Sequence, residues 1–247
     1  MKYSVIIPYY KRANHLWNTL ISYRRWYSSR TDYEIIIIED NGNATDAAEH
    51  RELLNVIAAF ADLRIVHLTS EHGHQWNPVR HRNQAARAAQ GSVFVLTNPE
   101  CYHKVDILGE LERMGDLAGR YVVCACASCK LSISRAGTLD ELVANEQMIE
   151  WYQHSVHNNR KLHFCTVITR TDYNRIGGFD EAYAPFCGYD DDDFREKIRV
   201  AGIAFVVRDD MVTVHVAHER SHQAGTEPAQ RAGLAFYNKK WGYNRTQ

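Results

Sequence analysis

The chain has 247 residues, of which 45% are hydrophobic and 24% charged, and its formal net charge at pH 7 is −1. These values are ordinary for a globular protein, and the near-neutral charge argues against broad attraction to nucleic acid or to an anionic membrane. No apolar run approaches the roughly 20 residues that span a bilayer, and the apolar part of residues 1–8 is too short for a signal peptide. We therefore expect one cytoplasmic domain over residues 1–247.

The first half of the chain alternates strand-like and helix-like segments. Short β-branched apolar runs predict buried strands, and apolar residues at helical spacing predict helices. The strands are expected over residues 4–8, 34–38, 63–68 and 92–96, and the helices over residues 14–27, 46–60 and 78–90. Four successive isoleucines, residues 35–38, leave no polar face, which is typical of a parallel sheet covered on both sides. This order predicts a doubly wound α/β unit.

The second half is less regular. Strands are expected over residues 122–126, 163–169, 203–207 and 211–216, helices over residues 139–152 and 191–201, and a folded-back aromatic tail over residues 236–243. The helix over residues 191–201 opens with an acidic first turn, which is favourable against the helix dipole. Residues 219–226 are polar and predict a loop.

Six cysteines raise the question of a disulfide or a metal site. Cys126 and Cys129 have the Cys-x-x-Cys spacing, but no second pair and no histidine pair at zinc-finger spacing accompanies them. Cys124 and Cys126 are expected on one face of a strand. Buried thiols behave as small hydrophobic groups, so we expect reduced packing residues, with metal or redox chemistry as the alternative.

Polar residues follow three of the predicted strands, at residues 8–12, 39–42 and 97–100. In an open α/β sheet, ligands bind beyond the carboxyl ends of the strands, so these segments are expected to line one crevice. Neither Gly-x-Gly-x-x-Gly nor Gly-x-x-x-x-Gly-Lys-[Ser/Thr] occurs in the chain. A dinucleotide fold and an NTPase phosphate loop are therefore not supported.

An ordered set of segments resembles family 2 glycosyltransferases with the GT-A fold. Residues 4–12 with 37–42 are similar to the family's opening, residues 82–93 to its Arg-Asn segment, and residues 177–181 with 188–194 to its acceptor-side motif. The last pair also resembles a galactosyltransferase-like C-terminal segment. The resemblance implies an α/β fold with a mostly parallel central sheet, flanking helices and a smaller acceptor-side subregion. It makes residues 1–118 the nucleotide-sugar-binding half and residues 119–247 the acceptor-binding and catalytic half.

The resemblance also implies a divalent cation, Mn²⁺ or Mg²⁺. Relatives usually carry Asp-x-Asp after the fourth strand, whereas this chain has Asn98-Pro99-Glu100. Glu100 supplies a carboxylate, which hard cations prefer, and Asn98 offers the donor site only a neutral carbonyl oxygen. A late histidine completes the metal shell in galactosyltransferase-like relatives, which implies His215 or His218. His215 directly continues a strand and is preferred, with His218 as its rival. A strand end with an incidental glutamate is the structural alternative.

The catalytic base follows from the acidic run at residues 190–193. An acceptor hydroxyl must lose a proton as it attacks, which calls for a positioned carboxylate. By position in the resembling motif this residue is Asp191, while Asp190, Asp192 and Gly188 lie on the acceptor side. Adjacent carboxylates repel one another and raise the pKa of one of them. An ordinary acidic helix start is the alternative. Trp151, Tyr152 and His154 are expected to form an acceptor-facing wall, although a packed helix also explains Trp151.

The nucleotide pocket is implied by the first half of the resemblance. Asp40 matches the position that hydrogen-bonds the base, commonly uracil. The backbone of Pro8 and the ring of Tyr10 frame the same pocket, and Arg82 contacts the base or the phosphates. Arg12, by contrast, is expected in solvent.

These features favour an inverting, metal-dependent transferase that moves a sugar from a nucleotide sugar, most simply a UDP-sugar, to a hydroxyl on a glycan or glycoconjugate. One alternative keeps the fold and places the acceptor in DNA, as in phage-type transferases that modify hydroxylated nucleobases. The phosphate contacts would then come from Arg80, His81, Arg82, Arg87 and the Arg160–Lys161 pair, against the neutral total charge. Another alternative is a nucleotide-sugar-binding module without turnover, suggested by the altered Asp-x-Asp.

Overall fold

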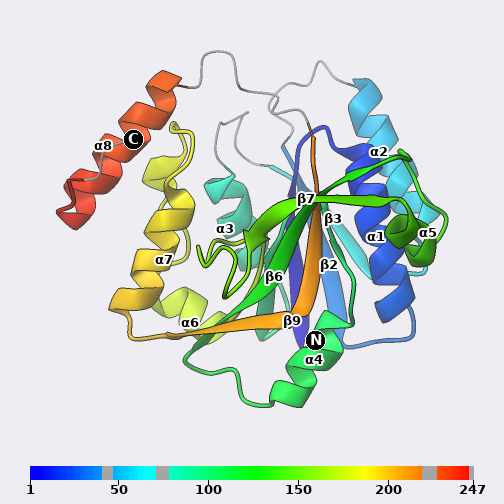
Figure 1. Ribbon diagram of the computed structural model, residues 1–247, viewed down its shortest axis with the longest axis horizontal. Coiled ribbons are helices and arrows are strands. Elements are labelled where there is room, and N and C mark those ends of the chain that lie inside the picture. Colours follow the sequence, from blue (N-terminus) through cyan, green and yellow to red (C-terminus); the bar gives the residue numbers. More distant parts are fainter. Residues whose placement is uncertain (41–46, 71–77, 219–226, 245–247) are drawn as a thin grey trace.

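A computed structural model describes residues 1–40, 47–70, 78–218 and 227–244. Its described residues form one nine-stranded sheet with helices on both sides (Figure 1). The first half contains β1 (Tyr3–Tyr9), α1 (Ala13–Tyr27), β2 (Tyr33–Glu39), α2 (Ala47–Ala59), β3 (Ile65–Thr69), α3 (Val79–Ala88) and β4 (Val93–Thr97). Every element predicted for this half is present, and its bounds lie within three residues of the expected ones.

The second half adds the remaining strands and helices. They are β5 (Cys101–His103), α4 (Ile107–Met114), β6 (Arg120–Leu131), α5 (Leu139–Ala144), β7 (Glu146–Gln153), β8 (Cys165–Thr169), α6 (Arg170–Arg175), the 3-10 turn η1 (Glu181–Tyr183), α7 (Asp190–Val200), β9 (Ala204–Val216) and α8 (Glu227–Trp241). The strand order is β3-β2-β1-β4-β8-β6-β9-β5, and β7 pairs with β6. The sheet is parallel from β3 to β4, whereas β8, β5 and β7 join it antiparallel. The whole sheet is therefore mixed.

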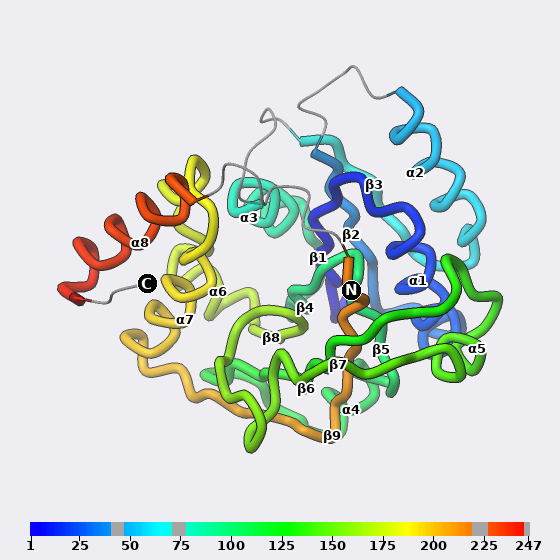
Figure 2. Tube along the Cα trace, turned by 45° about the horizontal axis from the view of Figure 1, so that its top comes forward, coloured from blue at the N-terminus to red at the C-terminus, as the bar shows by residue number. Residues whose placement is uncertain are grey.

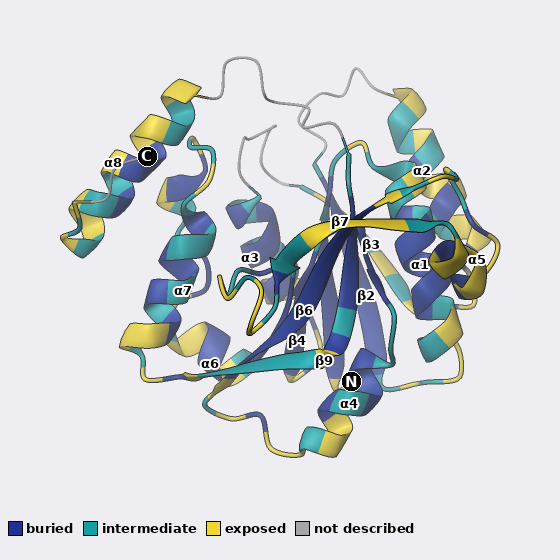
Figure 3. Ribbon diagram, in the orientation of Figure 1, coloured by how far each residue is buried: buried dark blue, intermediate teal, exposed yellow. Residues whose placement is uncertain are grey.

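The isoleucines of β2 explain why helices cover both faces. Ile35 and Ile37 pack into a core with Leu16, Leu20 and other residues of α1 and α2. Their neighbours Ile36 and Ile38 point to the opposite face, into a second core with Val79 and Ala85 of α3. Alternate side chains of a strand face opposite sides of its sheet, so four consecutive isoleucines serve two cores. Figure 3 shows the central strands as largely buried, with helices on either side of them.

The predicted helix over residues 139–152 is wrong. A short helix, α5, begins at its N-cap Thr138, whose side chain accepts a hydrogen bond from the backbone N–H of Glu141, and it ends at Asn145. Residues 146–153 then form β7, which pairs antiparallel with β6. Met148, Ile149 and Trp151 suit a strand as well as a helix, so pairing with a distant segment decides the outcome.

Two expected strands of the second half are one. Residues 203–207 and 211–216 belong to β9, which runs parallel to β6 and shifts register between Cys124 and Ala125. Between the partners of Cys124 and Ala125, β9 carries three extra residues, 209–211, and pairing with β6 continues on either side of them. The predicted aromatic tail forms most of the second half of α8, which lies beside α7 in both views (Figures 1 and 2).

The six cysteines are free thiols, as predicted, and five of them are buried. Cys124 and Cys129 belong to the first core. Burial raises the pKa of the Cys129 thiol to about 12, which keeps it protonated. The Cys-x-x-Cys spacing therefore reflects packing of β6.

Asn83 ties α3 to the segment that precedes α7. Its amide nitrogen donates to the Phe179 carbonyl at 2.9 Å and to Glu181 at 3.0 Å, and its oxygen accepts from Tyr173 at 2.7 Å and from the Phe179 N–H at 3.0 Å. These bonds use both donors and both lone pairs of the amide. The Arg-Asn and Gly-Gly-Phe-Asp segments are thus joined through one buried side chain.

Replacing Asn83 with alanine is expected to lower the free energy of unfolding by about 2–4 kcal/mol, because the buried partners at Phe179 and Tyr173 lose their hydrogen bonds. Chemical denaturation measures the change. Gln84→Ala, at the neighbouring position with a partly exposed side chain, should cost no more than about 0.5 kcal/mol. Equal losses in the two variants would contradict this role for Asn83.

Candidate functional site

Polar side chains gather beyond the carboxyl ends of the parallel strands. Asp40 follows β2, Asn98 and Glu100 follow β4, and His218 follows β9. Asp190, at the start of α7, reaches the same region through Arg82, whose guanidinium lies 3.8 Å from its carboxylate and donates to Asn98 at 2.9 Å. The topology therefore brings together residues from both halves of the chain.

Glu100 forms a cluster with two histidines. Its Oε1 lies 3.4 Å from His215 Nε2 and 3.7 Å from His218 Nε2. Burial alone would raise the pKa of Glu100, but hydrogen bonds from His215 and His218 hold it well below its ordinary value, so the carboxylate is ionised. Ligand atoms about 2.0–2.2 Å from one cation lie roughly 3–3.5 Å apart, so this spacing fits a metal ion with little rearrangement. The predicted metal residues thus meet.

Arg12 was expected in solvent, and the structure corrects this. It is half-buried, and its Nη2 lies 2.9 Å from His218 Nδ1. The ring of His15 stands edge-on to His218 at a centroid distance of 5.6 Å. Burial lowers the pKa of His15 to about 4, so this ring is neutral at pH 7. Arg12 supplies positive charge beside the cluster.

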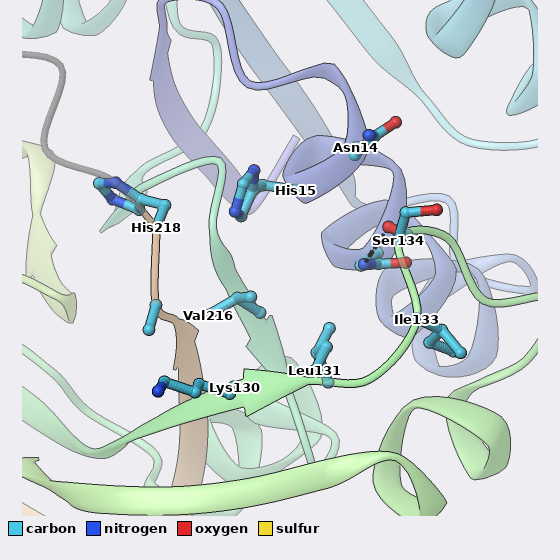
Figure 4. Close-up of a pocket in the computed structure, with 10 residues that line it drawn as sticks. Asn14, His15, Lys130, Leu131, Ile133, Ser134, Val216 and His218 are labelled. Carbon is cyan, nitrogen blue, oxygen red and sulfur yellow. Dashed lines mark hydrogen bonds between the residues drawn. The ribbon is translucent and has the colours of Figure 1, made fainter.

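Two grooves meet at His218. One, of about 660 Å³, lies between the start of α1 and the ends of β6 and β9, and Figure 4 shows His15, Lys130 and His218 on its wall. The other, of about 380 Å³, is lined by Tyr152, Phe164 and His215 together with Glu150, Asn158, Arg160 and Ala217. The cluster is therefore reachable from both sides.

Of the residues predicted to form an aromatic wall, Tyr152 lines the smaller groove. The ring of Tyr152 lies 5.0 Å from His215 and 5.1 Å from Phe164. Trp151 is on β7, where no helix exists, and it stacks on His157 at 6.0 Å. Neighbouring strand residues point to opposite faces, so only one of the pair faces His215.

The four aspartates of α7 have four different environments. Asp190 is buried beside Arg82, and Asp192 accepts a 2.7 Å bond from Arg195 one turn later. Asp193, 1% exposed, binds Lys240 at 2.6 Å and the Trp241 indole at 2.8 Å, so it holds α8. Gly188 precedes them with a φ of +80°, a conformation that favours glycine and turns the chain into the helix.

Asp191 is paired with a histidine that the sequence did not single out. Its Oδ1 lies 2.7 Å from Nε2 of His163, which is 4% exposed and precedes β8. The Asp191 side chain stays 31% exposed, and desolvation raises its pKa to about 6 against the opposing charge of Arg82. Only folding joins these residues, and among 13 histidines His163 had no distinguishing pattern.

The predicted nucleotide residues lie along β1, β2 and α3. Pro8 and Tyr10 are half-buried at the end of β1, and the backbone N–H of Asp40 donates to the Tyr9 carbonyl at 2.9 Å. The Asp40 carboxylate lies 3.8 Å from His81 Nε2 on α3. Arg82 is only 4% exposed and lies over the Phe179 ring at 5.3 Å. It sits below the crevice surface as a link between Asn98 and Asp190.

Comparisons with known proteins agree with this arrangement. The model of the family described as glycosyl transferase family 2 matches residues 4–171. The search of curated proteins gives no significant match. Among the described residues, no helix is sufficiently long and apolar to cross a bilayer.

Several solved structures share the fold. Mannosyltransferase PcManGT from Pyrobaculum calidifontis, solved with GDP-Man and Mn²⁺, aligns with a TM-score of 0.63 at 15% identity, covering 100% of this chain and 66% of that one. S. aureus TarS 1-349 with UDP-GlcNAc aligns with a TM-score of 0.63 at 16% identity, covering 91% of this chain and 61% of that one. GalNAc-T7 with UDP, GalNAc and Mn²⁺ aligns with a TM-score of 0.65 at 14% identity, covering 97% of this chain and 48% of that one. The chain thus spans about half to two thirds of these proteins' length, and the likeness establishes the fold.

Proposed function

This chain belongs to glycosyl transferase family 2 and has the GT-A fold, and we propose that it transfers a sugar from a nucleotide sugar, specifically a UDP-sugar, to a hydroxyl acceptor with inversion. The observation that carries the proposal is the presence of two separate clusters, Glu100 with two histidines and Asp191 with His163. One suits a cation and the other a base. Arg82 connects their neighbourhoods through Asn98 and Asp190. Among the similar structures, TarS contains UDP-GlcNAc and GalNAc-T7 contains UDP. The mannosyltransferase contains GDP-Man instead.

The cation, Mn²⁺ or Mg²⁺, is assigned to Glu100 and His215. When bound it neutralises the growing charge of the diphosphate leaving group. His218 is the weaker candidate because arginine has only donors, so Nδ1 of His218 accepts from Arg12. Its Nε2 then carries the proton of the neutral ring and has no lone pair to offer. Within the described residues the buried Nδ1 of His215 has no hydrogen-bond partner, which leaves its tautomer free to change.

The base is assigned to Asp191. The acceptor oxygen forms its bond to the anomeric carbon as the bond from that carbon to the diphosphate breaks, and the hydroxyl proton passes to the Asp191 carboxylate. A pKa of about 6 leaves this group ionised at neutral pH and still basic enough to accept the proton. Asp192, Gly188 and Trp151 remain proposed acceptor contacts, and Asp190, held by Arg82, is proposed to orient the acceptor side.

The nucleotide is assigned to the pocket formed by Pro8, Tyr10 and Asp40, with Asp40 accepting from the base. Arg82 donates a hydrogen bond to Asn98, and this pair lies between the Glu100 cluster and Asp190. The basic residues considered for DNA have other partners here, since Arg80 and Arg87 both lie 3.7 Å from Glu181. Together with the near-neutral total charge, these pairings support our proposal of a glycan or glycoconjugate acceptor.

Titration calorimetry with UDP, with and without Mn²⁺, tests the donor site. We expect UDP to bind on the order of tenfold or more tightly when Mn²⁺ is present, because a cation held by Glu100 would attract the negative charge of the diphosphate. A hydrolysis screen of UDP-, GDP- and TDP-sugars should then release UDP fastest. Equal UDP affinity with and without metal would count against the metal site, and preferred release of another nucleotide would replace UDP. Salt-sensitive binding to duplex DNA would support the DNA acceptor instead.

A further inference from the structure

His163 is a buried histidine that touches the proposed base. It comes from the segment between β7 and β8, and its Nε2 lies 2.7 Å from Asp191 Oδ1. Its ring meets Phe179 edge-on at 5.1 Å, and Phe179 stacks on Phe194 of α7 at 4.2 Å. The imidazole is therefore packed against the helix that carries the aspartate, so its position is fixed by the core.

The imidazole is a neutral hydrogen-bond donor at physiological pH. Burial, reinforced by the nearby charge of Arg82, lowers the pKa of His163 well below its ordinary value. A neutral ring carries one N–H, and a bond to an ionised carboxylate places that hydrogen on Nε2. A hydrogen bond of this kind favours the charged form of the carboxylate. It also fixes the rotation of the carboxyl group.

We propose that His163 is a positioning residue, which holds Oδ1 of Asp191 so that the second carboxylate oxygen is presented to the acceptor hydroxyl. The inference rests on the proposed role of Asp191 as the base. A carboxylate at the start of a helix with 31% exposure has several accessible rotamers, and only some of them point towards an acceptor. The bond to a rigid neighbour selects one of them before the substrate arrives.

A second cation is the competing explanation, because the ligand atoms of His163, Asp190 and Asp191 lie within 4.8 Å of one another. The guanidinium of Arg82 already lies 3.8 Å from Asp190 and supplies positive charge there. A cation on Nε2 of His163 would also have to displace the 2.7 Å bond to Asp191. The geometry therefore points to orientation of the carboxylate rather than to metal binding.

The test compares His163→Phe with His163→Gln, using hydrolysis of the best UDP-sugar as the assay. His163→Phe should lower kcat by about 10- to 100-fold, with the donor KM changed less than about twofold, since positioning contributes only part of the effect of a general base. The acid limb of its pH profile should move to higher pH, because the ionised form of Asp191 loses a favourable bond. His163→Gln, which keeps an N–H donor, should recover part of the rate.

Controls separate this role from a structural one. His67→Phe removes another histidine–carboxylate contact, 3.1 Å to Glu39, and should leave kcat unchanged. In an Asp191→Asn background, His163→Phe should have no further effect, since the carboxylate is already gone. An equal loss in both backgrounds, or an unmoved acid limb in both His163 variants, would overturn the proposal, as would binding of two Mn²⁺ ions per chain with one lost in His163→Phe. Full activity of Asp191→Asn would instead reject the base itself.

Discussion

Replacing Asp191 with asparagine is expected to lower kcat by about 10²- to 10⁴-fold, the range that one general base contributes. The amide keeps the size of the side chain and cannot take the acceptor proton. Because Asp191 lies apart from the Glu100 cluster, affinity for UDP with Mn²⁺ should change less than about twofold. Initial rates of UDP release and calorimetric titration of the same preparation give both quantities. An Asp191→Asn enzyme that retains full activity would show that another group accepts the proton.

Asp193 provides the matched control, since it lies on the same turn of α7 with a different task. It is 1% exposed and binds Lys240 and Trp241 of α8. Asp193→Asn should therefore lower the free energy of unfolding by about 1–3 kcal/mol, because it breaks an ion pair in which Asp193 is buried and its partner is partly exposed. Its kcat in the folded state should stay near that of the original chain. The two neighbouring aspartates thus separate catalysis from stability.

The pH dependence of the reaction follows from the same carboxylate. Desolvation raises the pKa of Asp191 to about 6, so below that pH the group is increasingly protonated and cannot act as a base. The rate should fall about tenfold for each pH unit below 6 and level off above 7. A rate that is constant between pH 5 and 7 would contradict the assignment.

The first half of the fold could be predicted from local pattern because its strands are nearly all apolar. The isoleucines of β2 have only one suitable environment, a strand between two helical layers. In the second half, residues 146–153 could not be predicted, because β7 exposes Met148 and Ile149 and gains its structure by pairing with β6. Nothing within residues 146–153 records that partner. Prediction therefore failed where pairing across the chain outweighs local preference.

The site could be predicted where its residues sit in recognisable motifs. Asp191 and Glu100 each belong to a spaced pattern, and the structure places each beside a histidine. Arg12 and His218, in contrast, are 206 positions apart and meet only through the fold. His163 lies in an irregular segment before β8, where neither periodicity nor spacing marks it. The contact between Arg12 and His218 and the pairing of His163 with Asp191 were thus missed, since they depend on the fold.

Replacing Glu100 with glutamine should weaken Mn²⁺ binding, measured with saturating UDP, by on the order of 100-fold or more, because loss of an outer-shell partner alone costs 10- to 100-fold. Glutamine has the same shape but lacks the charge that hard cations prefer. The carboxylate is held ionised by its two histidine neighbours, and the variant removes that charge from the centre of the cluster. Calorimetry and the electron paramagnetic resonance signal of free Mn²⁺ measure the affinity, and turnover at fixed Mn²⁺ should fall in parallel.

The two histidines then decide how the cluster holds the cation. If His215 is the ligand, His215→Gln should approach the effect of Glu100→Gln, while His218→Gln should weaken Mn²⁺ binding by less than about tenfold, the lower end of an outer-shell change. The reason is the Arg12 guanidinium, which lies 2.9 Å from Nδ1 of His218 and fixes the hydrogen on its other nitrogen. A larger loss from His218→Gln than from His215→Gln would reverse the assignment and require Arg12 to move away when the cation binds. Unchanged affinity in Glu100→Gln would remove the metal from this cluster altogether, because no charged ligand would then be needed there.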